Sequence, residues 1–196
     1  MKRRKTKVTR KTRETSIAVA LDLDGTGSYS IKTGLPFLDH MLDLFSRHSL
    51  IDLRVKAEGD LAVDYHHTVE DIGLCMGTAV HRALGGREGI TRYGFAAIPM
   101  DDALSEAVVD LGGRPFLVME VANRSKRILD FDLGLVEEFF RAFCAEARMN
   151  LHLRQKYGKE PHHAYESLFK AWARAMRQAV ALDAREKGVP SSKGSI

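Results

Sequence analysis

The sequence carries the pattern His-His-x-x-Glu twice, at residues 66–70 and at residues 162–166. Imidazole nitrogens and carboxylate oxygens are common ligands of transition-metal ions. Residues four positions apart share one face of a helix, whereas adjacent residues point about 100° apart. His66 and Glu70 can therefore hold one ion together, while His67 must serve a different ion or none. The second copy repeats this arrangement with His162, Glu166 and His163.

Other interpretations compete with a pair of metal sites. Histidines at the start of a helix can be surface or capping groups, but two copies at matching places favour metal binding. The spacing differs from the HExxH pattern, in which two histidines stand four positions apart, so a zinc metalloprotease is not predicted. A dinuclear metallohydrolase would need carboxylates that bridge two close ions, and the sequence offers no bridging aspartate.

Each half of the chain contains one more candidate ligand. His40, in the segment FLDHML, stands on a mostly apolar helical stretch, where a lone histidine is more often a core residue. Its counterpart, 98 positions later, is Glu138, which can also bind a metal. This equivalence favours a ligand role for both residues. His152, in the strand-like segment NLHL, is the alternative to Glu138, and the sequence leaves that choice open.

The elements that must position these residues also occur twice. Residues 66–84 match residues 162–180 in the histidine pattern and in the small and apolar residues that follow it. Residues 35–48 match residues 133–146 in the same way. Such a repeat predicts an α+β fold built from two similar halves that share a core.

Periodicity gives the approximate bounds of these elements. Apolar residues at helical spacing predict helices at about 35–48, 66–84, 135–148 and 162–185. Alternating polar and apolar residues predict a β-hairpin over 15–34 around Asp24-Gly25. Further strands are predicted at about 50–58, within 93–121 and at 150–156.

The net charge of +4 is concentrated at the N-terminus. Residues 1–13 contain eight basic residues and no acidic one, so the other 183 residues carry 22 basic and 26 acidic groups. We interpret residues 1–13 as a solvated basic tail, because nucleic-acid recognition would need aromatic or recognition-helix residues beside the charges. Residues 14–91 and 92–186 are then the two α/β repeats, and residues 187–196 form a C-terminal tail.

Cysteine usage and hydropathy bear on location. Cys75 and Cys144 lie in apolar helical stretches and form no CxxC pair, so we expect a reducing cytoplasm and no disulfide framework. No apolar run approaches the roughly 20 residues that span a bilayer. The basic N-terminus also lacks the apolar core of a secretory signal. The sequence therefore predicts a cytoplasmic protein without a membrane partner.

Four segments resemble the imidazoleglycerol-phosphate dehydratase family: DHMLDLFSRH at 39–48, DYHHTVED at 64–71, MDDALSEAVVDLGGRP at 100–115 and HHAYESLFKA at 162–171. The resemblance extends over essentially the whole chain. It implies two fused repeats like the second domain of ribosomal protein S5, each a roughly four-stranded sheet with two helices on one face. It also implies trimers that assemble into a 24-subunit shell when manganese is bound, with active sites between subunits.

The resemblance further implies two ligand sets. One Mn²⁺ ion would be held by His40, His67, His162 and Glu166. The other would be held by His66, Glu70, His163 and the residue at position 138. Many relatives have a histidine at that position, whereas this chain has Glu138. Either a carboxylate replaces the imidazole, or the second ion is held less fully.

The reaction implied is the dehydration of imidazoleglycerol phosphate to imidazoleacetol phosphate in histidine biosynthesis. Two ions would favour the imidazolate form of the ring, which then expels a hydroxyl group through a diazafulvene-like intermediate. Glu14, in RETS, matches a substrate-contacting glutamate of the family and is expected to handle the proton or the leaving hydroxyl. The other catalytic residues are the paired histidines His66, His67, His162 and His163.

The substrate phosphate calls for clustered cations. The resemblance assigns this role to Arg92, Arg114 and Lys193. Lys170, one helical turn beyond Glu166, is a further candidate, and Ser192 can add a hydroxyl donor if the C-terminal tail folds over the substrate. His40 and His48 are further substrate contacts. A non-catalytic alternative is an RNA-binding module of the S5 type with a structural metal, which would use the basic N-terminal segment.

Overall fold

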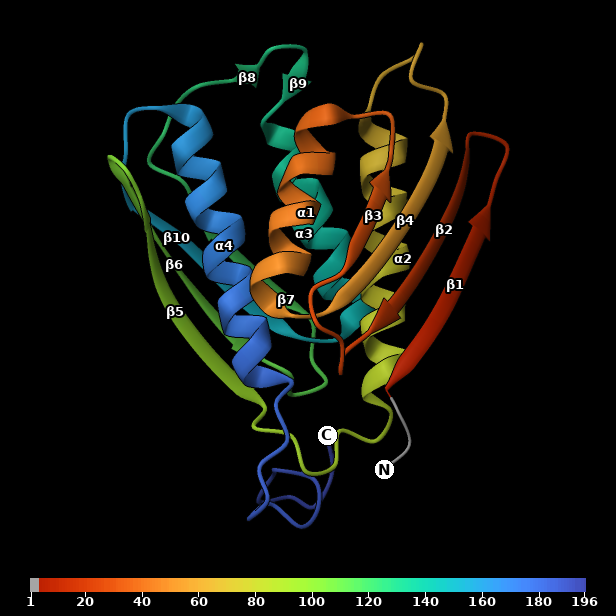
Figure 1. Cartoon of the computed structure of the whole chain (residues 1–196), viewed down its shortest axis with the longest axis vertical. Coiled ribbons are helices and arrows are strands. Elements are labelled where there is room, and N and C mark those ends of the chain that lie inside the picture. The colour runs from red at the N-terminus through yellow and green to blue at the C-terminus, as the bar shows by residue number, and fades with distance from the viewer. Residues whose placement is uncertain (1–3) are drawn as a thin grey trace.

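The computed structural model describes residues 4–196 of the chain, and residues 1–3 of the predicted tail lie outside that range (Figure 1). The first half contains β1 (Lys5–Lys11), β2 (Thr15–Asp22), β3 (Tyr29–Lys32), α1 (Pro36–Ser49), β4 (Asp52–Gly59) and α2 (His66–Leu84). Its strands form one sheet in the order β1-β2-β4-β3, in which β3 runs parallel to β4 and the other neighbours are antiparallel.

The second half has the same order of elements. It contains β5 (Tyr93–Met100), β6 (Ala103–Asp110), β7 (Phe116–Glu120), α3 (Gly134–Ala147), β10 (Asn150–Tyr157) and α4 (Pro161–Ala179). Its sheet order, β5-β6-β10-β7, is equivalent to that of the first sheet, and β7 runs parallel to β10. A short pair, β8 (Arg127–Ile128) and β9 (Phe131–Asp132), is inserted before α3. The duplicated α+β architecture is therefore confirmed.

The two sheets lie on the outside and the four helices lie between them (Figure 1). Helix α1 packs against α4, and α2 packs against α3. The strands turn alternate side chains toward this helical layer, and in β2 these are Ile17, Val19 and Leu21, all buried. Each sheet thus carries two helices on its inner face, because burial of that face requires a second layer.

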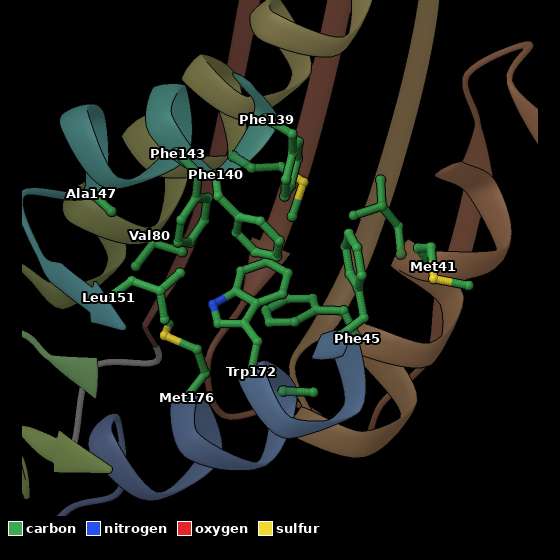
Figure 2. Close-up of a cluster of buried hydrophobic side chains, with 14 of the residues drawn as sticks. Met41, Phe45, Val80, Phe139, Phe140, Phe143, Ala147, Leu151, Trp172 and Met176 are labelled. Carbon is green, nitrogen blue, oxygen red and sulfur yellow. The ribbon is translucent and has the colours of Figure 1, made fainter. Parts of the chain in front are cut away.

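The centre of the helical layer is an aromatic cluster around Trp172 of α4 (Figure 2). Trp172 has no exposed surface and stacks on Phe45 of α1 with ring centroids 3.9 Å apart. Phe140 and Phe143 of α3 each meet its ring nearly at right angles, at centroid distances of 5.0 Å. Aromatic side chains contribute the largest buried apolar areas in a core. The cluster therefore fixes α1, α3 and α4 relative to one another.

The interpretation of the N-terminal segment as a solvated tail is wrong for most of its described residues. Residues 5–11 form the edge strand β1, which pairs with β2 along its whole length. Val8 is buried against the helices, and Arg10 on the same face forms an ion pair of 2.8 Å with Asp71 of α2. The strand escaped sequence analysis because only one of its seven residues is apolar. Its lysines stay exposed, as is common on sheet edges.

Residues 15–34 do not form the predicted hairpin either, because β4 lies between β2 and β3. After the Asp24-Gly25 turn the chain crosses the start of β4. There, Asp52 Oδ1 accepts hydrogen bonds from the backbone N–H groups of Thr26 (2.8 Å) and Ser28 (2.9 Å). A Cβ atom on Gly25 would lie 2.5 Å from Asp52, so the crossing requires glycine. The turn at Asp24-Gly25 was predicted correctly, but the path of the chain after it depends on Asp52, which lies 26 positions beyond Thr26.

The last helix also ends earlier than predicted, at Ala179 rather than at about Arg185. The residues beyond it turn back to the loop before β5. Leu182 forms a β-bridge with Ile90, and the Asp183 N–H group donates to the Gly89 carbonyl at 2.9 Å. These backbone partners replace the helical hydrogen bonds that residues 181–185 would otherwise need.

All four helices begin at one end of the molecule, beside β8 and β9 (Figure 1). Both His-His-x-x-Glu patterns open their helices, so they lie at this end, which we call the histidine end. The C-terminus and the loop between α2 and β5 lie at the opposite end. Among the helices of residues 4–196, none has the length and apolar composition needed to cross a membrane.

The close approach of α2 to α3 gives a test of the packing. A Cβ atom on Gly73 would lie 2.6 Å from the Phe139 carbonyl oxygen and 3.0 Å from the Ala142 Cβ atom. Gly73→Ala should therefore overpack this contact and cost about 1–3 kcal/mol of stability. Thermal unfolding should show a Tm lower by roughly 3–10 °C. Gly86→Ala is the control, because its Cβ atom would meet nothing closer than 3.7 Å; equal Tm values for the two variants would contradict the packing.

Candidate metal centre

Helices α1 and α4 bring three of the candidate ligands together at the histidine end. Glu166 Oε2 lies 3.1 Å from His162 Nε2 and 3.3 Å from His40 Nε2. One ligand atom from each residue falls within 4.8 Å of the other two. The rings of His40 and His162 are stacked with centroids 5.4 Å apart. We call this group the α1–α4 centre.

Local structure at the start of α4 sets two of these side chains. Pro161 begins the helix, and the Glu160 side chain caps it by accepting the His163 N–H group at 2.7 Å. Positions 162 and 166 are one turn apart, so both side chains lie on the face that packs against α1. His40 stands in the second turn of α1, beside the buried Met41 and Leu42. Packing between α1 and α4 therefore completes the centre.

The electrostatics of the α1–α4 centre suit a cation. Glu166 is only 7% exposed, and burial by itself raises the pKa of its carboxyl group. Hydrogen bonds from Lys170 and His40 outweigh that effect and lower the pKa below its usual value. Lys170 Nζ lies 2.5 Å from Glu166 Oε1. A buried carboxylate kept anionic between two imidazoles fits a first-row transition-metal ion.

The second histidine of each pair points away from its neighbour, as the helical geometry predicts. His67 Nδ1 lies 3.0 Å from Asp60 Oδ2, and His163 Nδ1 lies 2.8 Å from Asp102 Oδ1. Neither ring belongs to the α1–α4 centre. Each ring is thus held by an aspartate through Nδ1, and His163 Nε2 lies 3.5 Å from Asp101 Oδ2.

The remaining candidate ligands are less closely grouped within residues 4–196. His66 Nε2 lies 4.0 Å from Glu70 Oε2 on α2. Glu138, on α3 at the position equivalent to His40, lies 3.6 Å from Arg141 of its own helix. The alternative candidate, His152, is exposed on β10, where its alternating position turns it away from the helices. Of these two, only Glu138 shares the histidine end.

The candidate phosphate-binding residues are divided between the two ends of the molecule. Lys170 contacts Glu166 of the α1–α4 centre. Arg92 directly precedes β5 at the opposite end, where it forms an ion pair of 2.7 Å with Asp110 and donates to the Pro190 carbonyl at 2.8 Å. Arg114, Ser192 and Lys193 lie at that same end, on the loop after β6 and on the C-terminal tail. Within one copy of the chain, the histidine end is thus separated from most of the candidate phosphate-binding residues.

Glu14 and His48 complete the set of predicted site residues. Glu14 lies in the β1–β2 hairpin, and its exposed side chain comes within 4.0 Å of His67 Nδ1. His48 stands in the last turn of α1. Burial lowers the pKa of His48, and the nearby Lys170 and Arg174 add to the effect, so its ring favours the neutral form.

Sequence analysis missed two carboxylates, Asp60 and Asp102. Asp60 follows β4 directly, and Asp102 directly precedes β6. A signal for Asp102 exists in the repeat, because β2 and β6 are both eight-residue strands and an offset of 88 aligns Asp102 with Glu14. No such signal exists for Asp60, whose counterpart at the end of β10 is Gly158.

Comparisons with known proteins identify the family of the chain. The family model described as imidazoleglycerol-phosphate dehydratase matches residues 33–176. The imidazoleglycerol-phosphate dehydratase of Pelotomaculum thermopropionicum is 54% identical over 189 residues, which cover 96% of each chain. That of Methylorubrum extorquens is 52% identical over 190 residues, covering 96% of this chain and 97% of the relative.

Solved structures of the same enzyme share the fold. The crystal structure of imidazoleglycerol-phosphate dehydratase from Staphylococcus aureus matches with a TM-score of 0.83 at 35% identity, covering 91% of this chain and 99% of that one. The enzyme from Pyrococcus furiosus, in complex with (S)-C348, matches with a TM-score of 0.84 at 35% identity, covering 96% and 100%. The chain therefore belongs to the imidazoleglycerol-phosphate dehydratase family of histidine biosynthesis, whose members are hydro-lyases.

Proposed function

We propose that this chain dehydrates imidazoleglycerol phosphate to imidazoleacetol phosphate with two Mn²⁺ ions at each active site. The observation that carries the proposal is the α1–α4 centre, in which two imidazoles surround a buried, anionic carboxylate. His-rich sites of this kind accept manganese, iron, cobalt and zinc, and manganese is the ion that the family resemblance implies.

One ion would be held by His40, His162 and Glu166, with His67 supplied by another copy of the chain. The other ion would be held by His66, Glu70 and Glu138, with His163 from another copy. The fold duplication supports these sets, because α1–α4 and α2–α3 are equivalent helix pairs. The outward direction of His67 and His163 supports the exchange between copies.

The separation of the cations also supports an assembly. Arg92, Arg114 and Lys193 lie at the end of the molecule opposite the α1–α4 centre. A phosphorylated substrate can touch both groups only if the histidine end of one copy meets the opposite end of another. We propose the homo-oligomer implied by the family, a 24-subunit shell built from trimers in the cytoplasm, with no membrane or nucleic-acid partner.

The chemistry divides between the metal and the chain. When bound, the two ions favour the anionic form of the substrate's imidazole ring and so assist loss of the hydroxyl group from the adjacent carbon. Glu14 moves the proton at the neighbouring carbon, since its exposed carboxylate is near the second histidine. Lys170, Arg92, Arg114, Ser192 and Lys193 bind the phosphate through charge-assisted hydrogen bonds. His48 contacts the substrate from α1 as a neutral ring.

The proposed reaction can be tested directly. The purified protein, loaded with Mn²⁺ and given imidazoleglycerol phosphate, should release the enolisable ketone imidazoleacetol phosphate. His162→Ala and Glu166→Gln should each abolish turnover and lower the bound manganese, because each removes one ligand from the α1–α4 centre. Metal content is measured by elemental analysis of the dialysed protein. Full turnover and full metal content in either variant would refute the centre.

The second ligand set has its own test in metal stoichiometry per chain. Glu138→Ala should lower the manganese content, whereas His152→Ala should leave it unchanged, because His152 faces away from the helical layer. Glu137→Ala is a matched control, since Glu137 is the adjacent acid and binds Arg141 at 2.8 Å. Loss of manganese in the His152 variant alone would show that Glu138 is not a ligand.

The tail cations should act on substrate binding. Lys193→Ala should raise KM about tenfold, because one charge-assisted hydrogen bond contributes roughly 1.5–3 kcal/mol. The manganese content should stay at the wild-type value, since Lys193 belongs to the C-terminal tail, and the C-terminus lies at the end of the molecule opposite the histidine end. Lys187→Ala, a change on the same tail, is the control. Steady-state kinetics would contradict the assignment if both variants had the same KM.

A further inference from the structure

Two carboxylates face the same ring nitrogen of His67. Asp60 Oδ2 lies 3.0 Å from Nδ1, within hydrogen-bond distance, whereas Glu14 Oε2 lies 4.0 Å away. An ionised carboxylate can only accept a hydrogen bond, so the nitrogen that faces Asp60 carries the proton. The other nitrogen, Nε2, then presents its lone pair outward. Asp60 therefore holds His67 in the form that binds a metal through Nε2.

His163, the counterpart of His67, is held in the same way by a different residue. Asp102 Oδ1 lies 2.8 Å from His163 Nδ1. Asp102 Oδ2 accepts the backbone N–H groups of Lys159 (2.7 Å) and Glu160 (3.2 Å). These bonds, led by the one with His163, lower the pKa of Asp102 to about 2. Asp102 is thus a fixed anion that is fully engaged in orienting one ring.

The fold duplication makes this difference informative. Asp102 occupies the position of Glu14, directly before the second strand of its sheet. Asp60 follows β4 directly, and the equivalent position after β10 is Gly158. A Cβ atom on Gly158 would lie 2.6 Å from the Ala103 Cβ atom, so the second half cannot carry an acid there. In the second half, the acid directly before β6, Asp102, orients His163. In the first half, the acid directly after β4, Asp60, orients His67 instead.

We propose that Asp60 is a positioning residue that takes over the hold on His67 and thereby leaves Glu14 free to act on the substrate. The inference rests on the proposed function, in which Glu14 moves a proton. The hairpin supports it, because Thr12 Oγ1 accepts the Glu14 and Thr15 N–H groups at 3.1 and 2.9 Å and so fixes the Glu14 backbone. The Glu14 side chain can therefore turn either toward His67 or into the open hollow of about 390 Å³ that Glu14 and Asp60 both line.

Removal of Asp60 should therefore transfer Glu14 to His67. Asp60→Ala should lower kcat by at least about tenfold, since a lost general acid or base costs roughly 10²–10⁴. Its Mn²⁺ affinity should stay within about threefold, because Glu14 becomes the new acceptor for Nδ1. Asp102→Ala should instead weaken Mn²⁺ binding about 10–100-fold. Glu160 cannot replace Asp102, because its Oε2 already accepts the His163 N–H group as the cap of α4. Asp101 cannot replace it either, because Asp101 faces Nε2 of the ring, at 3.5 Å, rather than Nδ1.

The conservative variant separates positioning from folding. Asp60→Asn keeps an oxygen that accepts the Nδ1 hydrogen, so kcat should stay within about threefold of the wild type. Glu120→Gln is the matched control, because Glu120 is an exposed acid on the other sheet, where it binds Arg154 at 2.7 Å. In a Glu14→Ala background, Asp60→Ala should lower kcat no further but should weaken Mn²⁺ binding, since neither side chain then offers Nδ1 an acceptor.

A crystal structure of metal-free Asp60→Ala gives a readout that does not depend on turnover. We expect Glu14 within hydrogen-bond distance of His67 Nδ1. A Glu14 side chain that stays turned away, an Asp60→Ala variant with full kcat, or equal losses of Mn²⁺ affinity in Asp60→Ala and Asp102→Ala would each overturn the inference. Failure of the wild-type protein to dehydrate imidazoleglycerol phosphate would overturn the proposed function instead.

Discussion

The contact between α1 and α4 around Trp172 is the interaction on which the candidate site depends. Phe45 stacks on Trp172 at 3.9 Å, and this packing sets the distance between the two helices. His40 then meets His162 and Glu166 near the start of α4. Trp172 Nε1 has no hydrogen-bond partner among residues 4–196, so apolar burial rather than hydrogen bonding holds the ring. A small rotation of α1 would move His40 away from the other two ligands.

The duplicated fold has two equivalent halves, each a sheet with two helices, and the residues at equivalent positions have diverged. The α1–α4 pair carries His40, while the equivalent position on α3 carries Glu138, close to Arg141. The outer faces of the sheets have diverged as well: β1 and β4 present lysines and an arginine, whereas the second sheet exposes Tyr93, Phe95 and Phe116. The core positions kept their apolar character because both halves bury the same helical layer.

Helical geometry gives the two histidines of each His-His-x-x-Glu pattern different partners. In each pair, the first histidine faces the glutamate one turn away, and the second is held by an aspartate from a loop. Those aspartates come from different places in the two halves, after β4 and before β6. The same ring orientation therefore has two structural origins.

Local periodicity in the sequence determined the four helices and the pairing of each first histidine with its glutamate, since these depend on residues a few positions apart. The match between residues 66–84 and 162–180 determined the duplication. Tertiary structure alone decided that residues 5–11 form a strand, because its only buried apolar residue is Val8 and its register comes from β2. It also decided that β4 separates β2 from β3. His40 and Glu166 are 126 positions apart, and Asp102 and His163 are 61 apart. Contacts over such separations are set by the packing of helices and sheets, which no local pattern of residues records.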